Sequence, residues 1–435
     1  MLETLLPLLT QFLEGKTDLL SKSDSLSPRI YYYFKEIIRY WNKLNFILLR
    51  ISTGKTPPIS LQANCLYAIF RFLYEKTPIE TIFNELVAIS KTSSEKKILR
   101  SFLGTLRTFD WEQAIKGKSD EEILSLEAAI PTFVIQKLCP VMSFEFLKQN
   151  LQYMNDITRE STQSLRINTL RAEAEGDVVS QIESELKQQG IEFHPDSNIP
   201  ELYHISNEKK SIILQNHWYR SGHLIFQDKA SAAVVSILDP QPNELICDLC
   251  AAPGIKTSLI AQNTNNTAQI FAIDVQTQRT NQLKQLLHHL NVSGVGILNT
   301  DGLNLPFRSS FHFDKVLLDA PCTGSGTFLT NPELKWRQNQ KFLQQNCYFQ
   351  SKLLETAMSI LKPGGILVYS TCSLYPEEGE LQILKFKDTL LPLSLPNWIS
   401  ACYQIDESPL DGMGRLFPAI HQTQGFFVTK LQKVD

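Results

Sequence analysis

The chain has 435 residues, a length that corresponds to about three ordinary domains. Hydrophobic residues make up 43% of it and charged residues 20%, so it can bury large cores, which excludes a largely disordered chain. The 42 Lys and Arg residues against 45 Asp and Glu give a net charge of −3, so a surface for nucleic acid must be a local patch.

No apolar run reaches the roughly 18 residues that a membrane-spanning helix needs, so we expect no membrane segment. The amino terminus has an acid at Glu3 and lacks the basic start of a secretory signal, which favours an amphipathic helix. The eight cysteines are scattered along a chain that is long enough to fold without disulfides. Cysteine usage therefore predicts a reduced, cytoplasmic protein with free thiols.

Residues 1–150 show helical spacing of apolar side chains almost throughout, and Ser27-Pro28 is a typical helix start. Breakers such as Gly54–Pro58 and Thr92–Ser94 separate the helical stretches. We predict an all-helical domain over residues 1–150.

Residues 151–226 have a different pattern, which predicts a small α/β module. The stretch 165–171 alternates and contains β-branched residues, so we expect a strand there. An amphipathic helix is predicted over 176–190, ending at a glycine. Short strands are predicted at 211–214 and 223–226.

Residues 227–435 repeat the order strand, turn, helix, which predicts a doubly wound, mainly parallel sheet. Ligands of such sheets bind at the carboxyl ends of the strands. The predicted strands cover 244–248, 269–273, 294–298, 314–318 and 366–370, and the clearest helices cover 276–290 and 341–361.

The first three predicted strand ends carry residues suited to a nucleoside ligand. The turn 248–254 (DLCAAPG) is rich in small residues, so a ligand can approach its backbone and the amides of the next helix. Asp274 ends the second strand, where an acid can accept from ribose hydroxyls. Asp301 follows the third and can accept from an adenine amine. The chain has no phosphate-binding loop motif, so we expect a nucleoside without phosphate.

Two thiols are predicted at neighbouring strand ends. The fourth strand leads into Asp319, Pro321 and Cys322, and the next leads into Thr371 and Cys372. Beside a nucleoside site, two such cysteines suggest a thiolate nucleophile and a helper.

The sequence resembles the RsmB/NOL/NSUN-type RNA (cytosine-5) methyltransferases. The resemblance runs from about residue 131 to the carboxyl terminus and rests on motifs in the family order: LRINT, FQD, DLCAAPG, DAPCTGSG, TCS, RLFPAIH and GFF. It implies a class I (Rossmann-like) methyltransferase domain over 227–435 that uses S-adenosylmethionine, preceded by a small RNA-binding module over 151–226. The helical domain over 1–150 resembles a NusB-like extension.

The resemblance also implies site roles. Cys372 is the nucleophile that forms a covalent adduct with cytosine, Cys322 promotes release as a general base, and Asp319 and Lys256 act on the base. No metal is implied. The residues implied to bind the cofactor are Cys250, Ala251, Ala252, Pro253, Gly254, Ile255, Lys256, Asp274, Asp301 and Asp319. Ile255 departs from the family, which usually has a second glycine there, and a β-branched residue does not take a positive φ cheaply.

Other interpretations remain open. One alternative is that Asp274 and Asp301 simply cap a turn or a helix and contact no ligand. Cys322 and Cys372 can be small buried side chains. Cys247 and Cys250 have the C-x-x-C spacing of a metal half-site, but the sequence offers no second half, which favours core packing.

The expected function is methylation of carbon 5 of cytosine in RNA, either tRNA or rRNA, by a monomeric enzyme. The alternative is a non-catalytic RNA-binding protein on the same fold. In the small module, His217–Arg220 beside Lys209-Lys210 is the predicted place of RNA contact.

Overall fold

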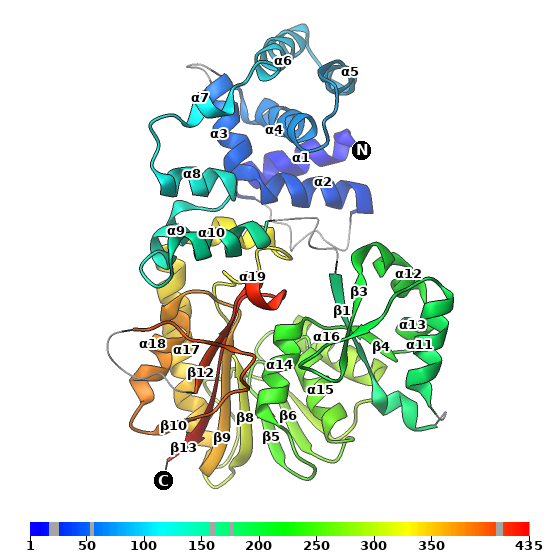
Figure 1. Ribbon diagram of the computed structural model, residues 1–435, viewed down its shortest axis with the longest axis vertical. Helices are drawn as coiled ribbons and strands as arrows, with labels where there is room; N and C mark the ends of the chain where they lie inside the picture. The colour runs from blue at the N-terminus through cyan, green and yellow to red at the C-terminus, as the bar shows by residue number, and fades with distance from the viewer. Residues whose placement is uncertain (17–25, 53–55, 156–161, 175–176, 406–411, 435) are drawn as a thin grey trace. The chain divides into compact units, whose positions relative to one another are not determined.

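The computed structural model describes residues 1–16, 26–52, 56–155, 162–174, 177–405 and 412–434 (Figure 1). The chain forms two compact units. The first consists of residues 1–139 together with 330–338, and the second of residues 140–329 together with 339–435. The predicted three-part division with boundaries at residues 150 and 226 stays a prediction.

The first unit is helical, as the periodicity predicts. Helix α2 begins directly after Ser27, with Pro28 in its first turn. Capping boxes start two other helices, in which Thr92 pairs with Glu95 and Ser119 with Glu122. The helices are α1 (Leu2–Leu13), α2 (Pro28–Arg39), α3 (Trp41–Ile51), α4 (Ile59–Leu73), α5 (Ile79–Ile89), α6 (Ser93–Leu106), α7 (Trp111–Ile115), α8 (Asp120–Glu127) and α9 (Thr132–Leu138).

A segment from far along the chain completes this unit. The short 3₁₀ helix Pro332–Arg337 packs on α2. Trp336 Nε1 donates to the carbonyl of Ile38 at 2.8 Å, and Lys335 Nζ donates to that of Arg39 at 3.1 Å. Because the last carbonyls of a helix lack partners within the helix, this segment caps the end of α2.

The second unit begins with α10 (Phe144–Tyr153) and a small antiparallel sheet with strand order β2-β3-β1-β4. Its strands and helices are β1 (Thr162–Ile167), α11 (Val178–Gln188), β2 (His194–Pro195), β3 (Leu202–Ser206), α12 (Lys210–Gln215), α13 (His217–Arg220) and β4 (Leu224–Phe226). The predicted small α/β module is therefore present. Residue 176, the predicted helix start, lies outside the described residues.

Two predictions in this module are wrong. The stretch 211–214 lies in α12 and not in a strand, because only Ile213 of that helix is buried, as one face of a helix requires. The strand predicted over 165–171 ends at Ile167. There the Asn168 side chain donates to the carbonyls of Gly222 and Leu290 and turns the chain into a 3₁₀ helix.

The larger sheet has the strand order β11-β12-β13-β9-β8-β5-β6-β7, with β10 paired to β13. The predicted strands and helices are present as β5 (Leu245–Asp248), β6 (Gln269–Asp274), α16 (Thr277–His289), β7 (Val295–Asn299), β8 (Phe313–Asp319), α17 (Gln340–Ile360) and β9 (Leu361–Thr371). These five strands are parallel. The antiparallel remainder was not predicted and consists of β10 (Leu390–Leu393), β11 (Ser400–Ala401), β12 (Met413–Leu416) and β13 (Phe426–Lys433).

Helices cover both faces of this sheet, as expected for a doubly wound α/β fold (Figure 1). Ile246 of β5 packs in a cluster with α14 (Lys229–Leu238) and α15 (Ile255–Asn263), whereas the next residue, Cys247, packs with α17. Burial on both sides explains the continuous apolar runs of these strands. The carboxyl ends of β5, β6, β8 and β9 therefore lie along one edge. Short helices α18 (Glu380–Ile383) and α19 (Pro418–His421) follow β9 and β12.

The small sheet is fixed to the helices of the larger sheet. The Arg166 guanidinium donates to Ser258 Oγ of α15 at 2.7 Å, and Gln262 Nε2 of the same helix donates to the Ile167 carbonyl at 3.1 Å. In the described ranges, no helix is long and apolar enough to cross a membrane.

Candidate active site

The two predicted thiols meet at the carboxyl edge of the larger sheet. Cys372 directly follows β9, and Cys322 lies in the loop after β8. Their Sγ atoms are 3.2 Å apart. The Gly326 amide donates to the Cys372 carbonyl at 3.0 Å, which fixes the loop against the strand end. The structure thus brings together two residues that are 50 positions apart.

A glycine is needed at position 326 because the backbone there lies against the backbone of Gly425. A Cβ atom there would lie 2.0 Å from the Gly425 carbonyl oxygen. The Gly425 amide in turn donates to the Gly326 carbonyl at 2.9 Å. The motif glycine therefore allows the segment before β13 to lie against the cysteine loop.

Lys256 and Asp319 form an ion pair beside the thiols. Lys256 Nζ lies 2.6 Å from Asp319 Oδ2, and Ser370 Oγ donates to Asp319 Oδ1 at 2.7 Å. Burial disfavours the charged form of Lys256, but the negative groups around it, chiefly the carboxylates of Asp319 and Asp248, together outweigh burial and raise the pKa of Lys256. The negative charge that a Cys372 thiolate would carry acts on Lys256 in the same direction. A lysine cation therefore faces the site where the nucleophile was predicted.

Cys322 is held in its neutral form. Its hydrogen bond to Cys372, its burial and the negative charges of Cys372 and Glu378 raise the pKa of Cys322 well above the usual value of a thiol. The largest of these causes is Cys372 itself, so the proton affinity of Cys322 depends on the chemical state of its neighbour.

The sequence analysis did not identify Glu378, which is fully buried and bonded to the loop that carries Cys322. Its carboxylate accepts from the Thr323 amide at 2.9 Å, from Thr323 Oγ1 at 2.5 Å and from Gln350 Nε2 at 2.9 Å. The sequence did place an acidic run, Glu377-Glu378, shortly after Cys372. Only the fold shows that the second acid points inward.

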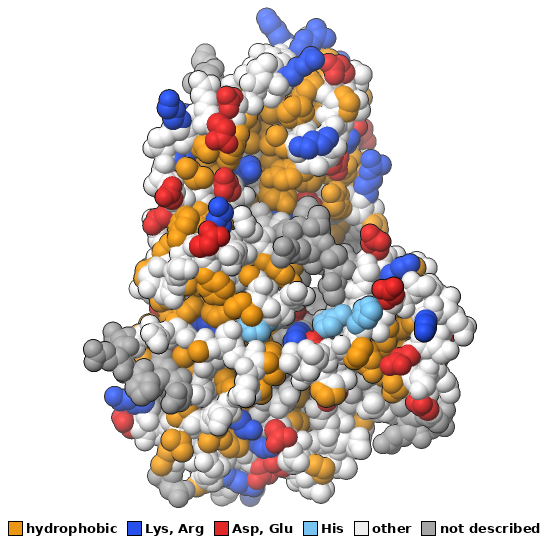
Figure 2. All heavy atoms as spheres, viewed as in Figure 1, with side chains coloured by type: hydrophobic (Ala, Val, Ile, Leu, Met, Phe, Trp, Pro, Cys, Tyr) orange, Lys and Arg blue, Asp and Glu red, His pale blue; other side chains and the backbone are white. Residues whose placement is uncertain are grey.

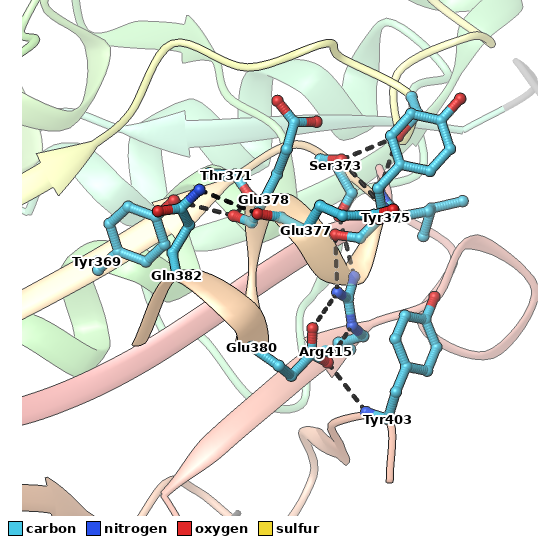
Figure 3. Close-up of polar contacts among 12 residues, drawn as sticks. Tyr369, Thr371, Ser373, Tyr375, Glu377, Glu378, Glu380, Gln382, Tyr403 and Arg415 are labelled. Atoms are coloured by element: carbon cyan, nitrogen blue, oxygen red, sulfur yellow. Dashed lines mark hydrogen bonds and ion pairs between the residues drawn. The ribbon is translucent and has the colours of Figure 1, made fainter. Parts of the chain in front are cut away.

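A second buried acid, Glu380, pairs with the motif residue Arg415 (Figure 3). Arg415 Nε lies 2.7 Å from one Glu380 oxygen and Nη2 lies 2.5 Å from the other. The same guanidinium donates to the carbonyls of Ser373 at 3.0 Å and Tyr375 at 3.3 Å. This pair fixes the segment that directly follows Cys372.

The predicted cofactor turn occupies the loop between β5 and α15. Gly254 has φ +106, a conformation that favours glycine, and a Cβ atom there would lie 2.5 Å from Leu283 Cδ1. Ile255 is the first residue of α15 and is not among the residues with positive φ, so a β-branched side chain is tolerated. The other predicted turn residues, Cys250 to Pro253, lie directly before Gly254. The Arg279 guanidinium donates to the Ala252 carbonyl at 2.5 Å.

Asp274 ends its strand and Asp301 follows its strand, as predicted, and both side chains also bind local backbone. Asp274 is buried at the end of β6, accepts from the Gln276 amide at 3.0 Å and pairs with Arg279 at 3.3 Å. Asp301 is exposed and accepts from the Leu303 amide at 3.0 Å. Arg279 therefore links Asp274 to the turn, whereas the roles of both acids toward a ligand stay predictions.

Asp248, at the end of β5, was not predicted as a binding residue and is 1% exposed. Thr257 Oγ1 donates to its Oδ2 at 2.7 Å, while its buried Oδ1 has no hydrogen-bond partner among the described residues. Burial raises the pKa of Asp248 to about 7. A buried carboxylate with a free oxygen beside a glycine turn suits a cationic amino group of a ligand.

Cys247 points into the core next to α17, as the packing interpretation predicts. No group of three or more His, Cys, Asp or Glu side chains that could hold a metal occurs among the described residues. In the small module, Trp218 is buried and donates to Glu185 at 2.8 Å, so its ring is a packing residue rather than a surface for bases.

Residues 235–432 match the family model of the 16S rRNA methyltransferase RsmB/F. The chain is 30% identical over 390 residues to the probable ribosomal RNA small subunit methyltransferase B of Synechocystis sp., which covers 87% of this chain and 84% of that protein. It is 32% identical over 356 residues to a 28S rRNA (cytosine-C(5))-methyltransferase of Mus musculus, covering 78% of this chain and 44% of that protein. The crystal structure of PH0851 aligns with a TM-score of 0.75 and 27% identity, over 95% of this chain and 93% of that one.

The site fits S-adenosylmethionine, the methyl donor of this fold, because the turn at Gly254 leads directly into the first turn of α15, and Asp248, which is bonded to Thr257 of that helix, has a carboxylate oxygen without a hydrogen-bond partner among the described residues. The enzyme uses this cofactor. The predicted class I methyltransferase fold is confirmed, with the helices and the small module before it. The chain therefore belongs to the 16S rRNA methyltransferase RsmB/F family.

Proposed function

We propose that this enzyme methylates carbon 5 of a cytosine in ribosomal RNA through a covalent bond between Cys372 and carbon 6 of the base. The enzyme is an RNA (cytosine-C5)-methyltransferase. The observation that carries the mechanism is the thiol pair, with Sγ atoms 3.2 Å apart beside the ion pair of Lys256 and Asp319. One thiol suffices for attack, and the second lies within reach of the same base for the next step.

The first step makes carbon 5 nucleophilic. The Cys372 thiolate forms a bond to carbon 6, and the electrons of the C5–C6 double bond move into the ring toward N3. Lys256 places a positive charge where this negative charge develops, and Asp319, held by Lys256 and Ser370, can accept from the exocyclic amine. When bound, S-adenosylmethionine would supply an electrophilic methyl group: carbon 5 would bond to the methyl carbon as the bond from that carbon to the sulfonium sulfur breaks, which would leave S-adenosylhomocysteine.

The second step releases the product. Once Cys372 is bonded to the base, it carries no negative charge, so the largest cause of the raised pKa of Cys322 is removed. Cys322 can then lose its proton to solvent and, as a thiolate, remove the proton on carbon 5. The electrons of that C–H bond restore the double bond between carbons 5 and 6, and the sulfur of Cys372 leaves as a thiolate.

Ribosomal RNA is favoured over tRNA because both named relatives act on ribosomal RNA. The mechanism needs two free thiols, which supports action in a reducing compartment such as the cytoplasm. One chain supplies every proposed site residue, which supports a monomeric enzyme. On the face in Figure 2, Lys and Arg are interspersed with Asp and Glu, so RNA contact on that face would be local.

The substrate is tested by incubating the full chain with labelled S-adenosylmethionine and either purified ribosomal RNA or tRNA, followed by nucleoside analysis. We expect label in 5-methylcytidine from ribosomal RNA, and none with Cys372→Ala. Label only in tRNA would contradict the substrate, and RNA binding without any transfer would favour the non-catalytic alternative.

A further inference from the structure

Glu378 joins the two strand ends that carry the thiols. Its carboxylate binds both the amide and the hydroxyl of Thr323, the residue after Cys322. Its own carbonyl accepts from Tyr369 Oη at 2.9 Å and from Thr371 Oγ1 at 3.1 Å, both on β9 before Cys372. One buried residue is therefore bonded next to each cysteine.

Gln350 of α17 reinforces this arrangement. Its Nε2 donates to Glu378 Oε1 and to the Pro321 carbonyl, each at 2.9 Å. Pro321 and Thr323 flank Cys322, so the backbone on both sides of that cysteine is held. The position of the Cys322 sulfur relative to Cys372 thus depends on a carboxylate that is itself fully buried.

We propose that Glu378 is a positioning residue that fixes the Cys322 loop and, through its negative charge, keeps Cys322 the protonated member of the thiol pair. This inference rests on the proposed function, because it explains which thiol attacks and which accepts a proton. Burial raises the pKa of Glu378, but the hydrogen bonds that it accepts from Thr323 and Gln350 favour its charged form, and that charge is one of the causes that raise the pKa of Cys322.

The charges around the pair support this assignment. The titratable groups that act on Cys322 are Cys372 and Glu378, and Cys372 in turn acts on Lys256, the partner of Asp319. Glu378 also acts on three other groups, Cys347, Tyr369 and Tyr375, and the neighbouring Glu377 acts on the first and last of these. Burial, with the Glu378 charge next, raises the pKa of Cys347 to about 12 and that of both tyrosines well above normal, so all three are neutral. Lys256 and Asp319 compensate each other. The partners of Glu378 given above are an amide, a hydroxyl and a side-chain amide, none of which carries a charge.

Two substitutions of Glu378 distinguish the effect of its charge from its role in positioning the Cys322 loop. Glu378→Gln removes the charge but keeps an oxygen for the Thr323 and Gln350 amides and a group that can bond the Thr323 hydroxyl. Glu378→Ala removes the whole clamp. Glu355→Gln on α17, whose carboxylate is exposed and pairs only with Lys352 among the contacts resolved, is the matched control.

The charge is tested without RNA by the rate at which iodoacetamide alkylates Cys322 in the full chain carrying Cys372→Ser, measured on the Cys322 peptide by mass spectrometry. Loss of one nearby charge shifts a pKa by about one unit, so we expect about tenfold faster alkylation at pH 8 in Glu378→Gln and no change in Glu355→Gln. A folded Glu378→Gln protein with an unchanged rate would overturn the proposal.

The position is tested with RNA and cofactor. We expect Glu378→Ala to accumulate a covalent protein–RNA adduct, because Cys322 is no longer held for release, whereas Glu355→Gln turns over normally. Failure of Cys322→Ala to form any adduct would contradict the covalent mechanism and not the role of Glu378. Adduct in Cys322→Ala but none in a folded Glu378→Ala protein would contradict the positioning role alone.

Discussion

Replacing Arg415 with Met should destabilise the second unit more than any exposed charge substitution. Arg415 and Glu380 are both fully buried, and the guanidinium makes two bonds to the carboxylate and two to the carbonyls of Ser373 and Tyr375. Without Arg415, Glu380 keeps only the amide of Tyr403 as a described donor, at 2.9 Å.

The size of the effect follows from this burial. Removing one partner of a buried ion pair leaves the other charge uncompensated and costs about 3–5 kcal/mol. For a unit of this size, such a loss corresponds to a melting temperature lowered by about 10 °C. The exposed pair of Lys352 and Glu355 has a similar distance, 2.8 Å, but is expected to contribute less than about 1 kcal/mol.

Differential scanning calorimetry of Arg415→Met, with Lys352→Met as the control, measures the difference. A double variant, Arg415→Met with Glu380→Leu, should recover part of the stability, because no buried charge then remains unpaired. A melting temperature of Arg415→Met within about 2 °C of the control would refute the reasoning that this pair holds the segment after Cys372.

Three further outcomes are expected. The pKa of Asp248 is raised to about 7, so the affinity for S-adenosylmethionine should fall about tenfold per pH unit below pH 7, and calorimetric titration should show no such dependence in Asp248→Asn. The same raised pKa means that the cofactor-free protein loses stability as pH rises from about 4 to 7, and Asp248→Asn should lose less. Gly326→Ala places a Cβ atom against the Gly425 carbonyl, so we expect the rate of methylation to fall at least about tenfold. Gly324→Ala is the control, because Gly324 has a φ of +69 and its substitution strains the backbone without that collision. Equal losses in both glycine variants would contradict the close-approach argument.

The sequence was sufficient to predict the parallel part of the sheet because each strand is a short apolar run between turn residues and helices. The stretch 211–214 was predicted wrongly because a short apolar run fits both a strand and a helix, and only burial of Ile213 alone distinguishes them. The antiparallel strands at the carboxyl end were missed because their pairing with β9 is a long-range property.

Some residues of the candidate site were also predicted from the sequence, and others were not. Cys322 and Cys372 were predicted because they follow strand ends, whereas the roles of Asp319 and Lys256 were implied by the family resemblance. The structure brings all four to one edge. Glu378, Glu380 and Asp248 were not predicted. Their importance comes from burial and from partners such as Gln350 or Arg415 that lie far away in sequence, which no local pattern reports.

The central claim is tested most directly by incubating Cys322→Ala protein with labelled ribosomal RNA and S-adenosylmethionine and separating the products on a denaturing gel. The mechanism predicts a slow-migrating protein–RNA species, absent in the double variant with Cys372→Ala, in which mass spectrometry finds a methylated cytidine on the peptide of Cys372. A labelled peptide that contains another residue, or methylated RNA released at the normal rate by Cys322→Ala, would contradict it.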